Sequence, residues 1–535
     1  MLLKGKGLVL RKLARTEMFK FLKNNLGTDL ILRNTIVVSI IGILFFNIFF
    51  GEKIPVNNGK GWDGNYYYEL SHELSVQQFF DGKTIGDYYI HRIAPWLFIN
   101  VIEKFVCFFF VQSDCLVTTY QIAEIVLFLN LVIAVFLIIR IAHILNFRSV
   151  QTTLSIVLLL CNASILKISG YYIFLTEYYA LTLMLCSIYF YLKKSIIALS
   201  LCTLVLNFTW PVLFFNYIMI YKLMIKQNSI PLHYKPSFFG ETIRIFSIFL
   251  MKYRLLISVF CGISFIILSI KASLIIRHNP IAVGFYDNIM RFDNIGYIFG
   301  LLVNVISYFS IVLFFIYFGI SFLWRKNKLK SSWFYSLRII FLLTGILCLN
   351  CITSIFSNAD VPNPSSPIFF LIYRILRISS LPWDVLICTS MYFGIFIYIL
   401  ILKRNQVYIF LMNQSWINIM AVSLSAIFML NGEARMNIVI FPIVIFCLIR
   451  LIGNDPFIRR NIIYISIVAL LLSRFYLPFG AFLDGQNFTN FEFFPNQDYF
   501  MYFSPWLSWR GWLTSALVNG VVFVLIRKFL KSFVR

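Results

Sequence analysis

The 535-residue chain is 60% hydrophobic and only 13% charged, and its formal net charge is +24 at pH 7. Soluble proteins average about 25% charged residues, so this composition excludes an ordinary soluble enzyme and predicts a lipid environment. The Lys and Arg residues lie in short clusters between apolar segments, which argues against a nucleic-acid partner. The same distribution is expected of the cytoplasmic loops of a membrane protein.

Residues 1–34 form a basic, amphipathic segment that we expect to lie on the cytoplasmic surface of the membrane, without a cleavable signal. Apolar segments long enough to cross a bilayer recur through 35–527, which we treat as a single transmembrane domain. The predicted spans are 35–50, 119–139, 150–168, 173–192, 254–271, 298–323, 337–356, 385–402, 412–430, 437–452, 461–477 and 511–527. The predicted fold class is an all-α polytopic membrane protein of about 12–14 transmembrane segments, followed by a basic cytoplasmic tail over 528–535.

Charge orients these spans, because Lys and Arg are enriched in cytoplasmic loops. With the N-terminus inside, the long outer loops are 51–118, 272–297, 357–384 and 478–510. We find no internal repeat, which argues against a transporter built from inverted repeats.

Two segments do not fit a simple span. Residues 94–113 contain Glu103 and Lys104, so this segment either crosses the membrane or lies in its outer interface. Residues 195–222 are apolar with basic residues at both ends, and the sequence Asn207-Phe208-Thr209-Trp210-Pro211 interrupts them. We expect two short helices that meet inside the membrane, since a broken helix is tolerated there when it lines a cavity.

The ten cysteines lie mostly within apolar segments, where they are expected to be small buried side chains. Only Cys107 and Cys115 lie near an outer loop. A bridge between them is the less favoured alternative to free thiols. The five histidines have no ligand spacing, so the sequence predicts no zinc site.

The most informative motif follows the first span and reads Gly61-Trp62-Asp63-Gly64-Asn65-Tyr66-Tyr67-Tyr68. Asp63 is a candidate general base, because a carboxylate within hydrogen-bond distance can accept a proton from a hydroxyl. Trp62, Tyr66 and Tyr67 are candidates for substrate binding, since aromatic rings form platforms for sugars and lipid tails. The alternative is that Asp-Gly makes an ordinary turn.

This motif resembles the first outer loop of membrane glycosyltransferases with the GT-C fold, both bacterial members with a "YDGQFYY"-like stretch and PIG-V-type mannosyltransferases with "WDG". The resemblance implies that Asp63 is the catalytic base. The following Tyr89-Ile90-His91-Arg92-Ile93-Ala94-Pro95 is similar to the Arg-and-Pro segment of the bacterial members, although it is one residue shorter before the proline. Arg92 is then a candidate to contact a phosphate.

Three later positions extend the resemblance. Leu175-Thr176-Glu177 is similar to the "LTE" or "YTE" of these enzymes, so Glu177 corresponds to their second acidic position; the alternative is an interfacial Glu that reaches water. Thr209-Trp210-Pro211 is similar to their "TRP" turn, with Trp210 in place of the arginine. Glu433 and Arg435 are similar to a late "ExR" turn, where Arg435 suits a lipid phosphate; the alternative is a local Glu433–Arg435 pair.

The resemblance implies a polyprenyl- or dolichyl-phosphate-linked sugar as donor and a hydroxyl of a glycan or glycolipid as acceptor. Transfer would occur with inversion on the non-cytoplasmic face, where Glu177 orients the acceptor or supports a divalent metal, Mg²⁺ or Mn²⁺. No other cofactor is implied. We expect the bacterial inner membrane, with the site facing the periplasm or exterior, and keep the endoplasmic reticulum as the alternative. The rival functions are an O-antigen-type polysaccharide polymerase and a non-enzymatic flippase or transporter of lipid-linked saccharides.

Overall fold

The computed structural model describes residues 29–54, 57–73, 89, 92–109, 118–210, 219, 384–407, 434–453, 456–477 and 509–530. Within these ranges the regular structure is helical and contains no strand. Several predicted segments lie outside the described residues, namely the spans 254–271, 298–323, 337–356 and 412–430, the outer loops 272–297 and 478–508, nearly all of 357–384, and residues 1–28 and 531–535 of the two ends.

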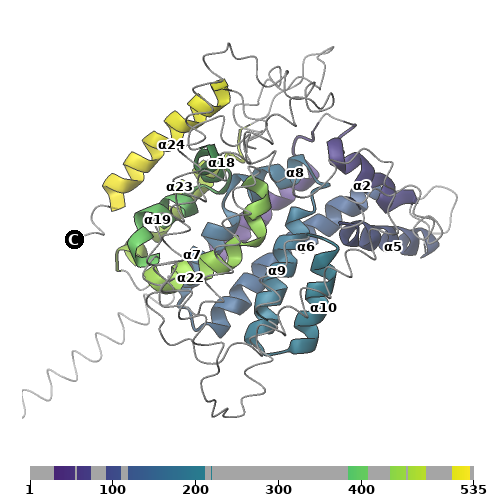
Figure 1. The fold of residues 1–535 in the computed structure, drawn as a ribbon, viewed down its shortest axis with the longest axis horizontal. Coiled ribbons are helices and arrows are strands. Elements are labelled where there is room, and N and C mark those ends of the chain that lie inside the picture. Colours follow the sequence, from purple (N-terminus) through teal and green to yellow (C-terminus); the bar gives the residue numbers. More distant parts are fainter. Residues whose placement is uncertain are drawn as a thin grey trace, which may run out of the picture.

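The described chain begins with a helix over Asp29–Phe49. The helices that follow, labelled in part in Figure 1, are α2 (Trp62–Glu73), α5 (Ala94–Phe109), α6 (Thr119–Ile144), α7 (Ser149–Leu160), η1 (Ser164–Ile168), α8 (Ser169–Tyr171), α9 (Glu177–Leu192), α10 (Ile196–Asn207), α18 (Asp384–Phe393), α19 (Ile395–Leu402), η2 (Ala434–Val439), α22 (Phe441–Ile452), α23 (Pro456–Ser473) and α24 (Trp509–Leu530).

Two of the described helices are long and apolar enough to cross a membrane, Asp29–Phe49 and α6. The first begins at Asp29, before the predicted start at residue 35. It buries one stripe at four-residue spacing, Ile36, Ile40, Leu44 and Ile48, and exposes other apolar side chains, among them Val38, Phe45 and Phe46. An apolar side chain gains nothing by facing water, so an exposed apolar face on a helix of this length is typical of a membrane protein.

The predicted span over 150–168 contains a break, because α7 and the segment Ser164–Tyr171 form a pair bent by 60°. Asn162 lies at the break. Its side-chain amide donates to the carbonyl of Leu159 (2.7 Å), and its side-chain oxygen accepts from the backbone N–H of Ile165 (3.0 Å). A side chain that bonds the neighbouring backbone competes with the regular helix, which accounts for the bend. The pair is either a broken span or a re-entrant loop.

Two other predicted segments also contain breaks. The segment 385–402 forms α18 and α19, separated by Gly394, whose φ of 64° interrupts the helix. The predicted break in 195–222 is confirmed at its first half: α10 ends at Asn207, and Phe208 and Thr209 form a turn before Trp210.

The helices pack in a continuous apolar core. Helix α6 contacts α7 and α9, α9 contacts α10 and η2, α7 contacts α22 and α23, and α18 contacts α24. Helices α2 and α5 pack on each other and on α6, and both lie to one side of α6, α9 and α10 in Figure 1. This corner of the molecule contains most of the residues that the sequence marks as functional.

Two ion pairs attach the end of the first helix to its neighbours. Lys53 Nζ lies 2.8 Å from Glu124 Oε1 of α6, and Lys167 Nζ of η1 lies 3.6 Å from Glu52 Oε2. Burial lowers the pKa of Lys53 from its ordinary value, and the Glu124 carboxylate partly offsets that shift. Lys53 also donates to the carbonyl of Gly170 (3.3 Å), so one side chain joins three segments.

Replacing Lys53 by Met is expected to destabilise the protein by about 2 kcal/mol, because a buried carboxylate at Glu124 loses its cation. The double variant Lys53→Met/Glu124→Met should recover part of that loss, since no charge is then left uncompensated. Thermal unfolding in detergent, followed by labelling of the buried thiols such as Cys161, measures both. A Lys53→Met variant as stable as the native protein would show that this ion pair contributes nothing.

Candidate functional site

Two glycines allow α2 to pack closely on the segment before α9. Gly61 has a φ of +78°, and a Cβ added there would collide with the ring of Tyr172. At Gly64, in the first turn of α2, an added Cβ would lie 2.7 Å from Phe174 Cβ and 2.9 Å from Tyr172 Cε2. The backbone N–H of Gly64 donates to the Tyr172 hydroxyl (3.1 Å). The Trp-Asp-Gly motif is therefore docked directly on the segment that leads into Glu177.

The interpretation of Asp63-Gly64 as a turn is wrong, since both residues lie in the first turn of α2. Asp63 is partly exposed there. Because the N-terminal end of a helix favours negative charge, this position also suits the stability of α2. Glu177 occupies the equivalent place in α9, in its first turn, but it is only 2% exposed. The two acidic residues that the sequence selected thus begin two helices whose starting segments are in contact.

An aromatic cluster fills the space between these helices. The ring of Tyr67 stacks on Trp96 at 4.9 Å between centroids, and Trp96 lies 5.5 Å from Phe174 and 5.8 Å from Tyr179. On the outer side of α2, Tyr66 is 49% exposed and stacks on Tyr89 at 4.8 Å. Of the three predicted platform residues, Tyr66 presents its ring to the surroundings, whereas Tyr67 is buried and belongs to the core.

Arg92 and Trp210, 118 positions apart in the chain, lie together. The guanidinium carbon of Arg92 is 4.4 Å from the centroid of the Trp210 ring, and both residues are buried. The backbone N–H of Ala94 donates to the carbonyl of Phe208 (2.9 Å), which fastens the start of α5 to the turn that ends α10. A desolvated cation over an indole ring is stabilising by about 2 kcal/mol. Trp210 thus holds Arg92 in place. In the similar turn of GT-C enzymes, the position of Trp210 is itself an arginine.

Three buried side chains of this region carry hydrogen-bond donors. Trp96 Nε1, Tyr179 Oη and Trp210 Nε1 are buried, and the part of the chain that the structure describes offers them no partner. An indole N–H can only donate, and buried Trp and Tyr side chains usually find a partner. Since a buried donor left unpaired costs about 1–3 kcal/mol, these groups favour an acceptor-rich ligand such as a phosphate or a sugar.

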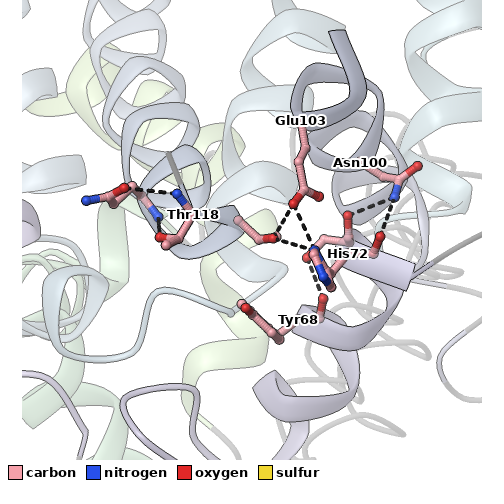
Figure 2. A network of polar contacts seen from close by, with 8 residues as sticks. Tyr68, His72, Asn100, Glu103 and Thr118 are labelled. Atoms are coloured by element: carbon pink, nitrogen blue, oxygen red, sulfur yellow. Dashed lines mark hydrogen bonds and ion pairs between the residues drawn. The ribbon is translucent and has the colours of Figure 1, made fainter. Parts of the chain in front are cut away.

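A polar network fixes the other end of α2 (Figure 2). His72 Nδ1 lies 2.8 Å from Glu103 Oε1 of α5 and 3.0 Å from Thr119 Oγ1 of α6. The Thr119 hydroxyl donates to the same carboxylate oxygen at 2.5 Å, and the Asn100 amide donates to the carbonyl of Ser71 at 2.9 Å. These contacts connect three helices and hold α2 at its C-terminal end, while Gly64 holds it at its N-terminal end.

The remaining predicted site residues are not placed by the structure. Trp62 begins α2 and Arg435 lies at the start of η2, but the structure does not describe their side chains. Glu433 lies outside the described residues. Within the described ranges, no group of three or more His, Cys, Asp or Glu side chains is placed to hold a metal ion. The divalent metal that Glu177 is expected to support stays a prediction, and the reaction proposed below uses no metal.

Cys107, near the end of α5, is disulfide-bonded, contrary to the favoured expectation of free thiols. The partner of Cys107 lies outside the described residues, because the other described cysteines form no disulfide: Cys161, Cys186, Cys202, Cys388 and Cys447. Disulfides persist in oxidising compartments, which fits a position of α5 outside the cytoplasm.

The chain matches no protein-family model, no curated protein and no solved structure. The chemistry of this site therefore rests on its own residues.

Proposed function

We propose that the chain is a polytopic membrane glycosyltransferase of the GT-C type, which moves a sugar from a polyprenyl or dolichyl phosphate to an acceptor hydroxyl on the non-cytoplasmic face. The observation that carries the proposal is the meeting of three motifs from distant parts of the chain. The helix of Asp63 docks on the segment before Glu177 through Gly64. Arg92, two residues before the helix α5 that packs on α2, stacks on Trp210.

The chemistry follows from the roles of these groups. Asp63 accepts the proton of the acceptor hydroxyl as its oxygen attacks the anomeric carbon. The bond from that carbon to the phosphate oxygen breaks on the opposite face, so the configuration inverts and the lipid phosphate leaves. Arg92 and Arg435 are the candidates to stabilise the charge that develops on the phosphate. Glu177 is a candidate to orient the acceptor.

The surroundings also support a lipid-linked donor. An outward-facing site has no access to cytosolic nucleotide sugars, whereas a lipid carrier diffuses to it within the bilayer. The buried N–H and O–H donors of Trp96, Tyr179 and Trp210 suit the oxygens of a phospho-sugar. The exposed ring of Tyr66 suits the apolar face of a sugar.

Mass spectrometry of surface glycans and lipid-linked sugars, from cells with and without the gene, tests this function. Loss of the gene is expected to remove one sugar from a glycan or glycolipid and to leave its lipid-linked donor in excess. Shorter polymers of unchanged repeat composition would instead identify a polymerase. Lipid-linked saccharide retained on the cytoplasmic leaflet, with all linkages intact, would identify a flippase.

Tyr179→Phe separates a ligand-binding role from a structural one. It removes a buried hydroxyl that has no acceptor among the described residues, so the protein is expected to become slightly more stable, by about 1 kcal/mol. If that hydroxyl binds the donor, KM for the lipid-linked sugar should rise about tenfold, the effect of one lost hydrogen bond. Thermal unfolding and initial rates measure the two effects, with Tyr189→Phe at the other end of α9 as control. Unchanged KM would remove Tyr179 from the site.

A further inference from the structure

Helix α5 buries polar side chains and exposes apolar ones, the reverse of a helix on the surface of a soluble protein. Its buried face carries polar side chains, Asn100 and Glu103, beside Trp96 and Ile99. Its opposite face exposes large apolar side chains, Leu97, Phe98, Val101, Phe105 and Phe108, which are 43–70% exposed. At 100° per residue these positions form one continuous stripe about 100° wide, with exposed Lys104 at its edge.

The buried polar side chains of α5 bond to neighbouring helices. Asn100 donates to the backbone of α2, and Glu103 contacts His72 and Thr119 (Figure 2). The apolar stripe therefore has no freedom to turn inward, because rotation of α5 would bury Lys104 and expose these bonded groups. A surface stripe of this size in water would be unfavourable at about 25 cal/mol for each Å² of apolar area.

The length and attachment of α5 decide how it meets lipid. Sixteen residues span about 24 Å, which is short of the roughly 30 Å of a hydrocarbon core. Its first turn is bonded to the carbonyl of Phe208 at the end of α10, and its last turn contains the disulfide-bonded Cys107. A disulfide at one end of α5 favours a position of that end outside the cytoplasm, because disulfides persist in oxidising compartments.

We infer that α5 does not cross the membrane but lies in the plane of the outer leaflet, with the stripe from Phe98 to Phe108 inserted among the lipids. The partner of this surface is the bilayer itself. Amphipathic helices of this kind bury their apolar face about 5–10 Å below the headgroups, and a lysine at the edge of the stripe reaches the phosphates. Since Trp96 and Arg92 lie at the start of α5, this placement brings the candidate site to the level at which a lipid phosphate would enter. Helix α5 can lie in the membrane plane whether or not the chain transfers a sugar, and sugar transfer does not require this orientation of α5.

Depth measurements on the full chain in phosphatidylcholine and phosphatidylglycerol vesicles test the inference. p-Acetylphenylalanine replaces Phe98 or Phe108 in separate variants, and its ketone is coupled to a nitroxide without touching the cysteines. Relaxation by oxygen, compared with relaxation by a water-soluble nickel chelate, gives the depth of each label. Phe136, 60% exposed on α6, is the control for a lipid-facing position, and Glu69 on α2 is the control for an exposed polar one.

The two labels are ten residues apart, about 15 Å along the helix axis. An in-plane helix predicts that both are protected from nickel and lie within about 4 Å of the same depth. A depth difference near 15 Å would show that α5 crosses the membrane and would overturn the inference. Nickel access equal to that at Glu69 would overturn it as well, because the stripe would then face water.

Discussion

Asp63→Asn is expected to reduce sugar transfer by about 100- to 10,000-fold, the usual contribution of a general base, while expression and membrane insertion remain unchanged. Asparagine has nearly the size and shape of aspartate, so the docking of α2 through Gly64 should persist. It cannot accept the acceptor's proton. Initial rates with a lipid-linked sugar donor, at saturating acceptor, measure the loss.

The matched control is Glu69→Gln, which makes the same change of carboxylate to amide on the same helix. Glu69 is exposed and bonded to Asn65 (2.8 Å), outside the proposed machinery. We expect its rate to stay within about twofold of the native rate, since surface changes of this kind have small effects. Native-like transfer by Asp63→Asn would remove the base assignment. Equal losses of transfer rate in both variants would show that the rate depends on the total charge of α2 and not on the Asp63 carboxylate in particular.

Gly64→Ala is expected to destabilise the chain by about 1–3 kcal/mol and to lower transfer together with stability. The added methyl would lie 2.7 Å from Phe174 Cβ, an atom next to the backbone that cannot move aside as the tip of a long side chain can. Helix α2 must then shift away from the segment that leads into Glu177. Thermal unfolding in detergent and the transfer rate measure the two effects.

Gly42→Ala is the control for this substitution, because a Cβ at Gly42 meets nothing within 4 Å. Alanine is the better helix former, so this control should be neutral or slightly stabilising. A Gly64→Ala variant as stable and active as Gly42→Ala would mean that the close packing of α2 on Phe174 is not required.

Several features of this corner could be predicted from local sequence. The interruption after Asn207 is one of them, because polar, aromatic and proline residues within an apolar segment break a helix, and α10 ends at that residue. The long apolar segment over 119–139 is another, since it forms the core of α6. Composition and period determine such features, and both are visible in one chain.

The misses have physical causes. Asp-Gly favours a turn in isolation, but the contacts of α2 with Phe174 and Trp96 extend the helix through it, so tertiary packing overrides local preference. The bend after α7 depends on a single side chain, Asn162, within an otherwise apolar run. The first outcome depends on packing partners that are distant in the sequence. The second depends on the hydrogen bonds of a single side chain.

The sequence does not identify Trp96 and Tyr179 as candidate site residues, because each resembles an ordinary aromatic residue in an apolar segment. The signal that could have found them is their polar atom, since a buried indole N–H or phenol O–H needs an acceptor. The contact of His72 with Glu103 could not be predicted either, because the two residues are 31 positions apart and only the packing of α2 on α5 brings them within 2.8 Å. Likewise, Arg92 and Trp210 were predicted separately, and their contact was not.

The most direct test of the account is a transfer assay with the purified full chain in vesicles that contain polyprenyl-phosphate-linked sugars and a glycolipid acceptor. The native chain is expected to release free polyprenyl phosphate and to form an equal amount of a new glycosidic linkage, whereas the Asp63→Asn chain should form almost none. If the folded native chain forms no linkage from any lipid-linked donor of the native membrane, or moves the donor between leaflets with its sugar still attached, the glycosyltransferase account is contradicted.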